Sequence, residues 1–270
     1  LLYLEDHPGR HRQRSELYAK TMFQSGQRSL IAPPKVKPLR LRIGYFSADF
    51  HDDQATAHLL ARLFQSHDSD RFETIAYSYG VSAQDKMLNR VIDAVDEFYD
   101  VQALRDADVA ELCRSHRLDI AIDLKGYTQH ARPGIFSCRA APIQIGYLGY
   151  PGTLGASFMD YIIADEVVIP HEQGLHYCEQ IIYLPHSYHV NDDARKIANN
   201  TVTRIDAGLP SEGFVFCCFN RNCKISPKEF DIWMRLLLQV NGSVLWLFES
   251  NEWARSNLLI EARKRGVEAD

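Results

Sequence analysis

A lysine between a predicted strand and a predicted helix is the first candidate for chemistry in this sequence. Lys224 follows an apolar run at residues 213–219, which predicts a strand, and precedes a helix predicted to begin near Ser226-Pro227. Ser226, Pro227 and Glu229 have the spacing of a capping box with proline at the first helical position. A helix amino terminus beside an ammonium group attracts anions. The sequence therefore predicts an anion site at Lys224; the alternative is a solvated surface lysine.

The polar loop around residues 49–58 is the second candidate. It follows a predicted strand at residues 41–47, and ligand-facing loops of α/β proteins lie at the carboxyl ends of strands. His51, Asp53 and His58 are side chains that can accept a proton in this loop. His58 also falls on a helix predicted at residues 55–65, where a packed, hydrogen-bonded histidine is the alternative interpretation.

A glycine-containing turn is the third candidate. It reads Leu148-Gly149-Tyr150-Pro151-Gly152. Glycine has no Cβ, so the backbone of such a turn can approach a sugar or a phosphate closely. An ordinary turn between two strands is the alternative.

Charged residues at the ends of another predicted strand, residues 118–124, form the fourth candidate. Asp119 lies near its start, and Asp123 and Lys125 lie at its end. A carboxylate beside a lysine at this position can orient a sugar, but a structural ion pair is equally compatible with the sequence.

The elements that must position these residues alternate between strand and helix. Such alternation predicts a parallel sheet with helices on both faces. Further strands are predicted at residues 72–79, 97–101, 143–148, 159–164 and 180–184, and helices at 83–94, 107–115 and 133–138. A second alternation has strands at 213–219 and 243–248 and helices at 227–240 and 252–265.

This pattern divides the chain into three predicted regions. Residues 1–38 are a helical remnant, with helical spacing at 15–23, and a proline-rich linker at 32–38. Residues 39–190 form a first Rossmann-like domain. Residues 191–270 are a connector and the start of a second, which is incomplete because two strand-helix units cannot close a doubly wound sheet. We therefore expect a fragment that is inactive alone.

Composition and charge argue against several classes of binding partner. The formal net charge of −5 gives no general positive field for nucleic acid, and no apolar run approaches the roughly 20 residues that span a bilayer. The six cysteines are scattered without a C-x-x-C pair or a matching histidine spacing. We expect reduced thiols in a cytoplasm, no metal site, no nucleic acid and no membrane.

Seven short segments together resemble the catalytic region of the O-linked N-acetylglucosamine transferase and SPINDLY family, in its bacterial form, over residues 39–265. The segments read GYFSADF from Gly44, DLKGYT from Asp123, APIQ from Ala141, LGYPGT from Leu148, MDYI from Met159, LPHSY from Leu184 and FNRNCKI from Phe219. Seven segments in the family's order are far more specific than one.

The resemblance implies a GT-B-like fold, in which two Rossmann-like halves face a cleft and tetratricopeptide helices precede them. It implies transfer of N-acetylglucosamine from UDP-N-acetylglucosamine to Ser or Thr of an acceptor protein, with inversion and without a metal or other cofactor. It also implies that further nucleotide contacts lie beyond Asp270, so this chain alone is expected to bind the donor poorly.

The same resemblance suggests roles for residues in the matching motifs. Lys224 would contact the diphosphate and act in catalysis. The other donor-side positions are Asn220, Arg221, Leu148, Gly149, Tyr150, Pro151 and Asp119, and the acceptor-side positions are His186 and Tyr188. Arg221 stands where the family would have an uncharged amide.

The catalytic base is the largest departure from the family pattern. A histidine is expected three residues after Asp49-Phe50, where this chain has Asp53, or Gln54 when counted back from His58. Proton removal would then fall to Asp53, His51 or His58, or to a water path to phosphate.

Three alternative functions follow from this departure and from the residues that the sequence leaves open. One is a non-catalytic scaffold that has lost the base. Another is a transferase that uses GDP-fucose or a different nucleotide sugar. The third is a sugar transferase that acts on a small molecule or a glycan.

Overall fold

The computed structural model describes residues 5–23, 31–32, 36, 38–81, 85–197 and 199–268. The chain divides into two compact units, one formed by His7–Arg195 and the other by the residues from Lys196 onward together with those before His7. Most of the predicted linker at residues 32–38 lies outside the described residues. Each unit is described by itself.

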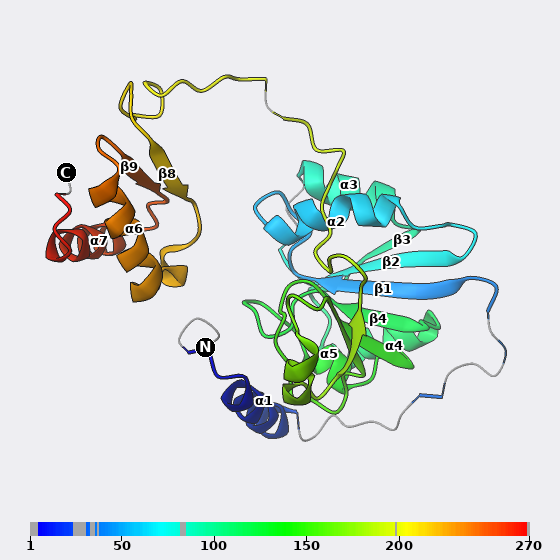
Figure 1. The fold of residues 1–270 in the computed structure, drawn as a ribbon. Helices are drawn as coiled ribbons and strands as arrows, with labels where there is room; N and C mark the ends of the chain where they lie inside the picture. Colours follow the sequence, from blue (N-terminus) through cyan, green and yellow to red (C-terminus); the bar gives the residue numbers. More distant parts are fainter. Residues whose placement is uncertain are drawn as a thin grey trace. The chain divides into compact units, whose positions relative to one another are not determined.

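A seven-stranded sheet forms the centre of the His7–Arg195 unit (Figure 1). Its order is β3-β2-β1-β4-β5-β6-β7, and every neighbouring pair is parallel. The strands are β1 (Leu41–Ser47), β2 (Phe72–Ser78), β3 (Glu97–Asp100), β4 (Ile120–Asp123), β5 (Ile143–Gly146), β6 (Tyr161–Ala164) and β7 (Gln180–Tyr183). The predicted parallel sheet is thus confirmed, with several strands shorter at one or both ends.

Helices cover both faces of this sheet, because side chains along a strand alternate between faces. Tyr45 of β1 packs in one buried cluster with side chains of α2 (Ala55–Gln65) and α3 (Lys86–Ala94). Its neighbour Phe46 packs in a second cluster with α4 (Asp106–Ser115) and α5 (Gly134–Ser137). Figure 1 shows the two helix layers on either side of the strands.

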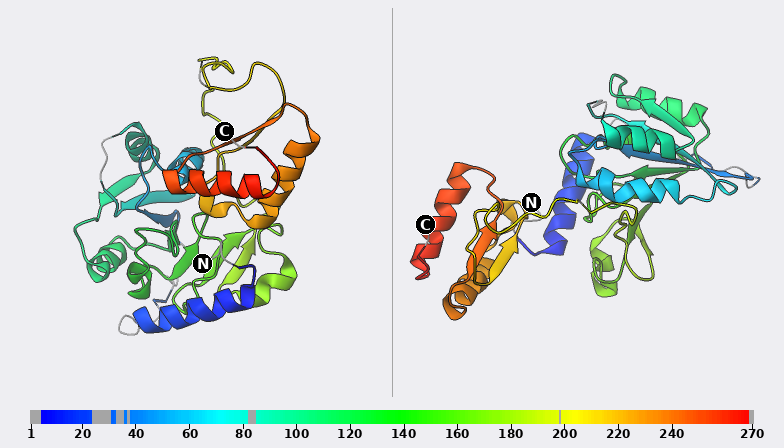
Figure 2. Two further views of the ribbon diagram at one scale, coloured as in Figure 1. Left: turned by 90° about the vertical axis from the view of Figure 1, so that its left-hand side faces the viewer. Right: turned by 90° about the horizontal axis from the view of Figure 1, so that it is seen from above.

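Helix α1 (Pro8–Met22) belongs to the same unit as the sheet and contacts the short 3-10 helix η1 (His171–His176). Figure 2 shows it beside the loops of this unit. It begins seven residues before the helical spacing of residues 15–23, because Pro8 occupies its first turn and His7 Nδ1 accepts a hydrogen bond from Arg10 N at 3.2 Å. Its assignment to a tetratricopeptide array stays a prediction.

The second unit contains two parallel strands, β8 (Val215–Cys218) and β9 (Val244–Leu247). Two helices, α6 (Pro227–Gln239) and α7 (Glu252–Lys264), bury Phe230, Met234 and Ala262 against each other and against Leu245 of β9. A 3-10 helix that the sequence did not predict, η2 (Asn222–Lys224), precedes α6.

The start of α6 differs in one respect from the predicted capping box. Ser226 is the N-cap and Pro227 lies in the first turn, as predicted. However, the Ser226 hydroxyl contacts the Glu229 carboxylate and makes no cap bond to a backbone N–H of this segment. The two side chains therefore satisfy each other, and the reciprocal side-chain-to-backbone bonds of a capping box are not formed.

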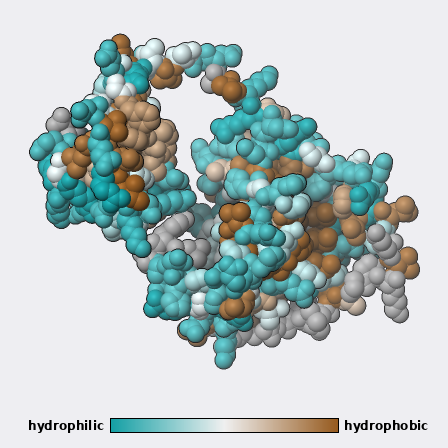
Figure 3. All heavy atoms as spheres, viewed as in Figure 1, coloured by the Kyte–Doolittle hydropathy of each residue, from teal (hydrophilic) through white to brown (hydrophobic). Residues whose placement is uncertain are grey.

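Hydrophilic residues cover most of the face seen in Figure 3, interrupted by small apolar patches. Among the described helices, none combines the length and the hydropathy that crossing a membrane requires.

We predict that Gly155→Ala loosens the packing of α1. A Cβ at Gly155 would lie 2.4 Å from the backbone nitrogen of Glu16 in α1, and Gly155 has a φ of +61°. Overpacking of this kind costs about 1–3 kcal/mol. We expect faster hydrogen exchange along α1 in this variant.

Gly208→Ala is the matched control, because Gly208 has a similar φ of +68° and nothing within 4 Å of a built Cβ. Equal exchange of α1 in the two variants would show that the close approach at Gly155 is unimportant.

Candidate functional site

The carboxyl ends of β1 and β4 lie side by side at the centre of the sheet. From β1 the chain proceeds to β2 and β3 on one side, whereas β4 to β7 extend on the other. Such a reversal of strand order is the place where doubly wound sheets bind ligands. Asp49 follows β1, Asp123 ends β4 and Lys125 follows it.

A buried ion pair joins these two strand ends. Lys125 Nζ lies 2.8 Å from Asp49 Oδ1 and 2.6 Å from Asp49 Oδ2. The two side chains are only 8% and 10% exposed. The sequence left open a structural pair between Lys125 and a carboxylate, and the partner in the structure is Asp49.

Asp123 holds the loop that follows β4. Its carboxylate accepts hydrogen bonds from the backbone N–H groups of Lys125 at 2.9 Å and Gly126 at 3.1 Å. Burial, which disfavours the charged form, raises the pKa of Asp123 to about 6, although both hydrogen bonds and the charge of Lys125 oppose the shift.

Tyr79, just after β2, lies close to the same charges. Its hydroxyl is buried and has no hydrogen-bond partner among the described residues. Burial, and then the carboxylates of Asp123 and Asp49, raise the pKa of this phenol well above its usual value. The hydroxyl therefore stays protonated.

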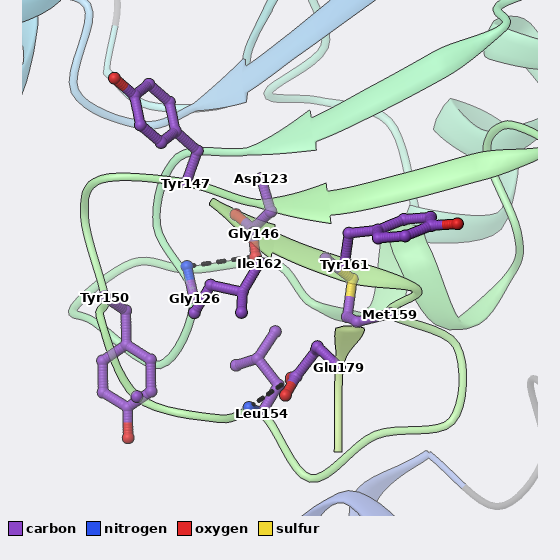
Figure 4. Close-up of a pocket in the computed structure, with 11 residues that line it drawn as sticks. Asp123, Gly126, Gly146, Tyr147, Tyr150, Leu154, Met159, Tyr161, Ile162 and Glu179 are labelled. Atoms are coloured by element: carbon purple, nitrogen blue, oxygen red, sulfur yellow. Dashed lines mark hydrogen bonds between the residues drawn. The ribbon is translucent and has the colours of Figure 1, made fainter. Parts of the chain in front are cut away.

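A small cavity lies beside Asp123, where β5 ends and β6 begins (Figure 4). It is lined by Asp123, Gly126, Gly146, Tyr147, Tyr150, Gly152, Leu154, Met159, Tyr161, Ile162 and Glu179. Its volume of about 10 Å³ is close to the minimum that holds one water molecule. A sugar or a nucleotide does not fit inside it.

The predicted donor-side turn forms one wall of this cavity. Leu148 is buried and has a φ of +66°, which is rare for a non-glycine residue. A Cβ at Gly149 would lie 2.0 Å from the carbonyl oxygen of Leu124, so only glycine fits there. Tyr150 packs against Gly126, and the exposed Pro151 accepts a hydrogen bond from Tyr177 Oη at 2.7 Å.

The two candidate bases have different surroundings, because Asp53 lies in the loop before α2 and His58 lies in α2 itself. Asp53 is exposed in a turn, whereas His58 Nε2 lies 2.7 Å from the backbone oxygen of Asp52. A carbonyl oxygen can only accept, so Nε2 carries the proton and the lone pair of a neutral imidazole resides on Nδ1. His58 thus has the hydrogen-bonded position that the sequence offered as an alternative.

Asp119 lies at the opposite end of β4 from Asp123 and Lys125. It precedes β4 at the amino end, where its carboxylate accepts a hydrogen bond from Arg42 N at 2.8 Å. The structure therefore does not bring Asp119 together with Asp123 and Lys125.

The predicted acceptor-side segment follows β7. Tyr188 is fixed through its backbone, whose N–H donates to Asp165 Oδ2 and whose carbonyl accepts from Tyr147 Oη, both at 2.8 Å. Tyr147 and Asp165 follow β5 and β6, so this segment lies at the carboxyl ends of those strands. His186 is exposed.

Asn220, Arg221 and Lys224 all have exposed side chains in the second unit, between β8 and α6. Lys224 is the last residue of η2, two positions before the N-cap of α6. A depression of about 470 Å³ lies nearby and is lined by Arg221, Asn222, Cys223, Phe248, Ser250, Asn251 and Ala254.

Three further residues contribute to this region and were not predicted from the sequence: Asp49, Tyr79 and Glu179. Asp49 had a usable signal, because it directly follows a predicted strand at its carboxyl end. Glu179 had none, since it lies in an irregular segment before β7 and acquires its partners only in the fold. Within the described ranges, no three His, Cys, Asp or Glu side chains gather as metal ligands.

Comparison with known proteins gives consistent matches. The sequence matches glycosyl transferase family 41 over residues 19–205 and again over residues 195–270. A probable UDP-N-acetylglucosamine–peptide N-acetylglucosaminyltransferase SEC from Arabidopsis thaliana is 35% identical over 236 residues, which are 86% of this chain and 24% of that protein. A probable SPINDLY transferase from Oryza sativa is 32% identical over 78% of this chain and 23% of its own length. The chain thus spans about a quarter of these relatives.

A solved structure is also similar. A mutant O-GlcNAc transferase of Thermobaculum terrenum superposes with a TM-score of 0.85 at 27% identity, covering 98% of this chain and 50% of the other. This likeness confirms the predicted α/β, GT-B-like fold class.

We predict that Lys125→Met lowers the free energy of unfolding by about 3–5 kcal/mol, because it leaves the Asp49 carboxylate buried without its partner. Urea denaturation measures the loss. The control is Lys264→Met, which breaks an exposed pair with Glu261 and should cost less than about 1 kcal/mol. Similar losses in the two variants would contradict a structural role for the buried pair.

We also predict a pH dependence of stability from Asp123. Its pKa is raised in the folded state, so its contribution to stability is full below the pKa of the unfolded chain and declines as pH rises through about 6. The free energy of unfolding should therefore fall by roughly 2–3 kcal/mol relative to Asp123→Asn between pH 4 and pH 7.5. A constant difference between the two proteins over this range would be inconsistent with the raised pKa.

Proposed function

The chain belongs to glycosyl transferase family 41, and from that premise we propose that the protein containing it transfers N-acetylglucosamine from UDP-N-acetylglucosamine to Ser or Thr hydroxyls of acceptor proteins. The family match over nearly the whole described chain is the observation that carries this proposal. The activity for which the Arabidopsis relative is named, at 35% identity over 86% of this chain, supports the choice of donor.

The proposed reaction is a single displacement. The acceptor oxygen forms a bond to the anomeric carbon from the face opposite UDP, and the bond between that carbon and the diphosphate oxygen breaks with inversion. The acceptor proton passes to a base, and negative charge accumulates on the departing diphosphate. The protein must therefore stabilise an anion and orient a hydroxyl, which cationic side chains and helix amides can do without a metal.

Lys224 is the proposed partner of the diphosphate. Its side chain is exposed, and it precedes the N-cap of a 13-residue helix, α6, by two positions. The free N–H groups of a helix amino terminus and a nearby ammonium both favour a phosphate. We assign Asn220 and Arg221, which come just before η2, to the same donor side.

The proposed base lies in the loop before α2 or at the start of α2 itself. Asp53 offers an exposed carboxylate, and His58 offers the lone pair on Nδ1 because Nε2 is bonded to the Asp52 carbonyl. The turn at Leu148, Gly149, Tyr150 and Pro151 is proposed to contact the donor, and His186 with Tyr188 the acceptor. We do not propose a donor contact for Asp119 beside this turn, since Asp119 lies at the amino end of β4.

A non-catalytic scaffold is the second candidate function. The observation that favours it is the loop before α2, where Asp53 and Gln54 occupy the positions at which the family resemblance implies a histidine. Isothermal titration of the full-length protein with UDP and with GDP tests both candidates. Binding of UDP supports the transferase, binding of GDP alone redirects it to a fucosyl donor, and binding of neither supports the scaffold.

We also propose a cytoplasmic location. All six cysteines lie in the described part of the chain and are free thiols. Such thiols persist in reducing compartments, where disulfides are rare.

We predict that Lys224→Ala in the full-length protein lowers kcat roughly 100-fold or more, because the diphosphate loses its cationic partner as charge develops. Radiolabelled sugar transfer to a co-purified acceptor protein measures the effect. Lys264→Ala, at an exposed lysine at the end of α7, is the control and should retain its rate. Unchanged turnover in a folded Lys224→Ala protein would remove this lysine from the mechanism.

A further inference from the structure

Glu179 is a buried carboxylate that the proposed reaction does not use. It is 6% exposed and lies immediately before β7. Its Oε2 accepts a hydrogen bond from Thr153 Oγ1 at 2.6 Å, and its Oε1 accepts one from the backbone N–H of Leu154 at 2.8 Å. Figure 4 shows Glu179 at the wall of the small cavity, joined to Leu154.

The Thr153 hydroxyl makes this arrangement specific for a carboxylate. The hydroxyl oxygen accepts hydrogen bonds from Gly155 N at 3.0 Å and from Cys178 N at 3.2 Å, while its hydrogen is donated to Glu179. Its two lone pairs and its one hydrogen are therefore all in use. A partner that offered an N–H group in place of a carboxylate oxygen would find no acceptor.

These contacts fix one end of the turn proposed to contact the donor. The other end is fixed where Gly149 approaches the Leu124 carbonyl and where Tyr150 packs on Gly126, whose N–H is bound by Asp123. One end of the turn from Leu148 to Thr153 is thus held by the Glu179 carboxylate, and the other end packs on a loop that the Asp123 carboxylate holds.

We propose that Glu179 is a positioning residue for sugar transfer, which holds the Leu148–Thr153 turn in the conformation that receives the nucleotide-sugar donor. This inference rests on the proposed function. In this role Glu179 contacts no reacting atom. It acts through its hydrogen bonds with Thr153 Oγ1 and Leu154 N. Because a turn that is already ordered loses little freedom on binding, the clamp lowers the entropic cost of donor binding.

The test is Glu179→Gln in the full-length protein. The glutamine amide has one oxygen for two donors, the Thr153 hydroxyl and the Leu154 N–H, so in either orientation its NH2 group faces a donor and the turn loses one hydrogen bond. We expect the donor KM to rise roughly tenfold with kcat within about twofold of the unaltered protein. Amides of residues 149–155 should exchange faster.

Two further variants refine the result. Glu172→Gln is the matched control, because it makes the same chemical change at an exposed glutamate in η1 and should leave both kinetics and exchange unchanged. Thr153→Val removes the hydroxyl and should reproduce the rise in donor KM. Thr153→Ser keeps the hydroxyl and should have the donor KM of the unaltered protein. If Glu179 and Thr153 act as one unit, the double variant Glu179→Gln with Thr153→Val is no worse than the more severe single variant.

The possible results separate this inference from the proposed function. A Glu179→Gln protein that melts earlier but keeps its donor KM would overturn the positioning role and leave the transferase proposal intact. If the unaltered protein neither binds UDP nor transfers sugar, the proposed function fails and the donor role fails with it. Hydrogen exchange at residues 149–155 then still tests whether Glu179 orders the turn, since equal exchange rates in Glu179→Gln and Glu172→Gln would show that it does not.

Discussion

The buried ion pair between Asp49 and Lys125 is the constraint on which the rest of the His7–Arg195 unit depends. Two charges taken out of water are costly, and only close geometry and further hydrogen bonds offset that cost. Here the ammonium contacts both carboxylate oxygens, at 2.8 and 2.6 Å. The pair lies between the ends of β1 and β4, so it fixes the two loops that leave the centre of the sheet. Other doubly wound sheets bind a ligand at this reversal of strand order. Here the side chains of Asp49 and Lys125 lie at that place.

In the proposed function, ligand contacts of this unit therefore fall to the loops around the pair. The backbone that carries Lys125 is shaped by Asp123 and continues from Leu124, whose carbonyl oxygen touches Gly149. Through that contact the position of the ion pair determines where the turn after β5 lies. The small cavity beside Asp123 has room for about one water molecule, which is consistent with a structural interior.

Regular elements were predictable from the sequence because each depends on neighbours along the chain. The spacing of apolar residues gave α2 and β1 their full observed ranges. The pairing of charges was not predictable in this way. Lys125 is two residues from Asp123 in sequence, yet its side chain pairs with Asp49, which lies 76 residues away. Asp119 is four residues from Asp123 but lies at the other end of the same strand.

The distinction between local patterns and contacts distant in sequence also explains where the structure differs from the remaining predictions. The early start of α1 depends on a histidine cap and a proline, which periodicity alone does not register. The partners of Glu179 lie about 25 residues away, in a loop whose path no local pattern specifies. Positions whose function rests on exposure and chemistry, such as Lys224, were found through motif spacing, and their roles stay proposals.

The docking of α1 has a consequence for the order in which the molecule assembles. Helix α1 is translated before the strands of the sheet, but the backbone it rests on, at Gly155, and the thiol that Glu16 contacts, at Cys178, emerge from the ribosome far later. Contacts so distant in sequence are slow to form, and a nascent chain cannot make them until the residues exist. The first helix of this chain is therefore seated late, after a large part of the seven-stranded sheet has been synthesised.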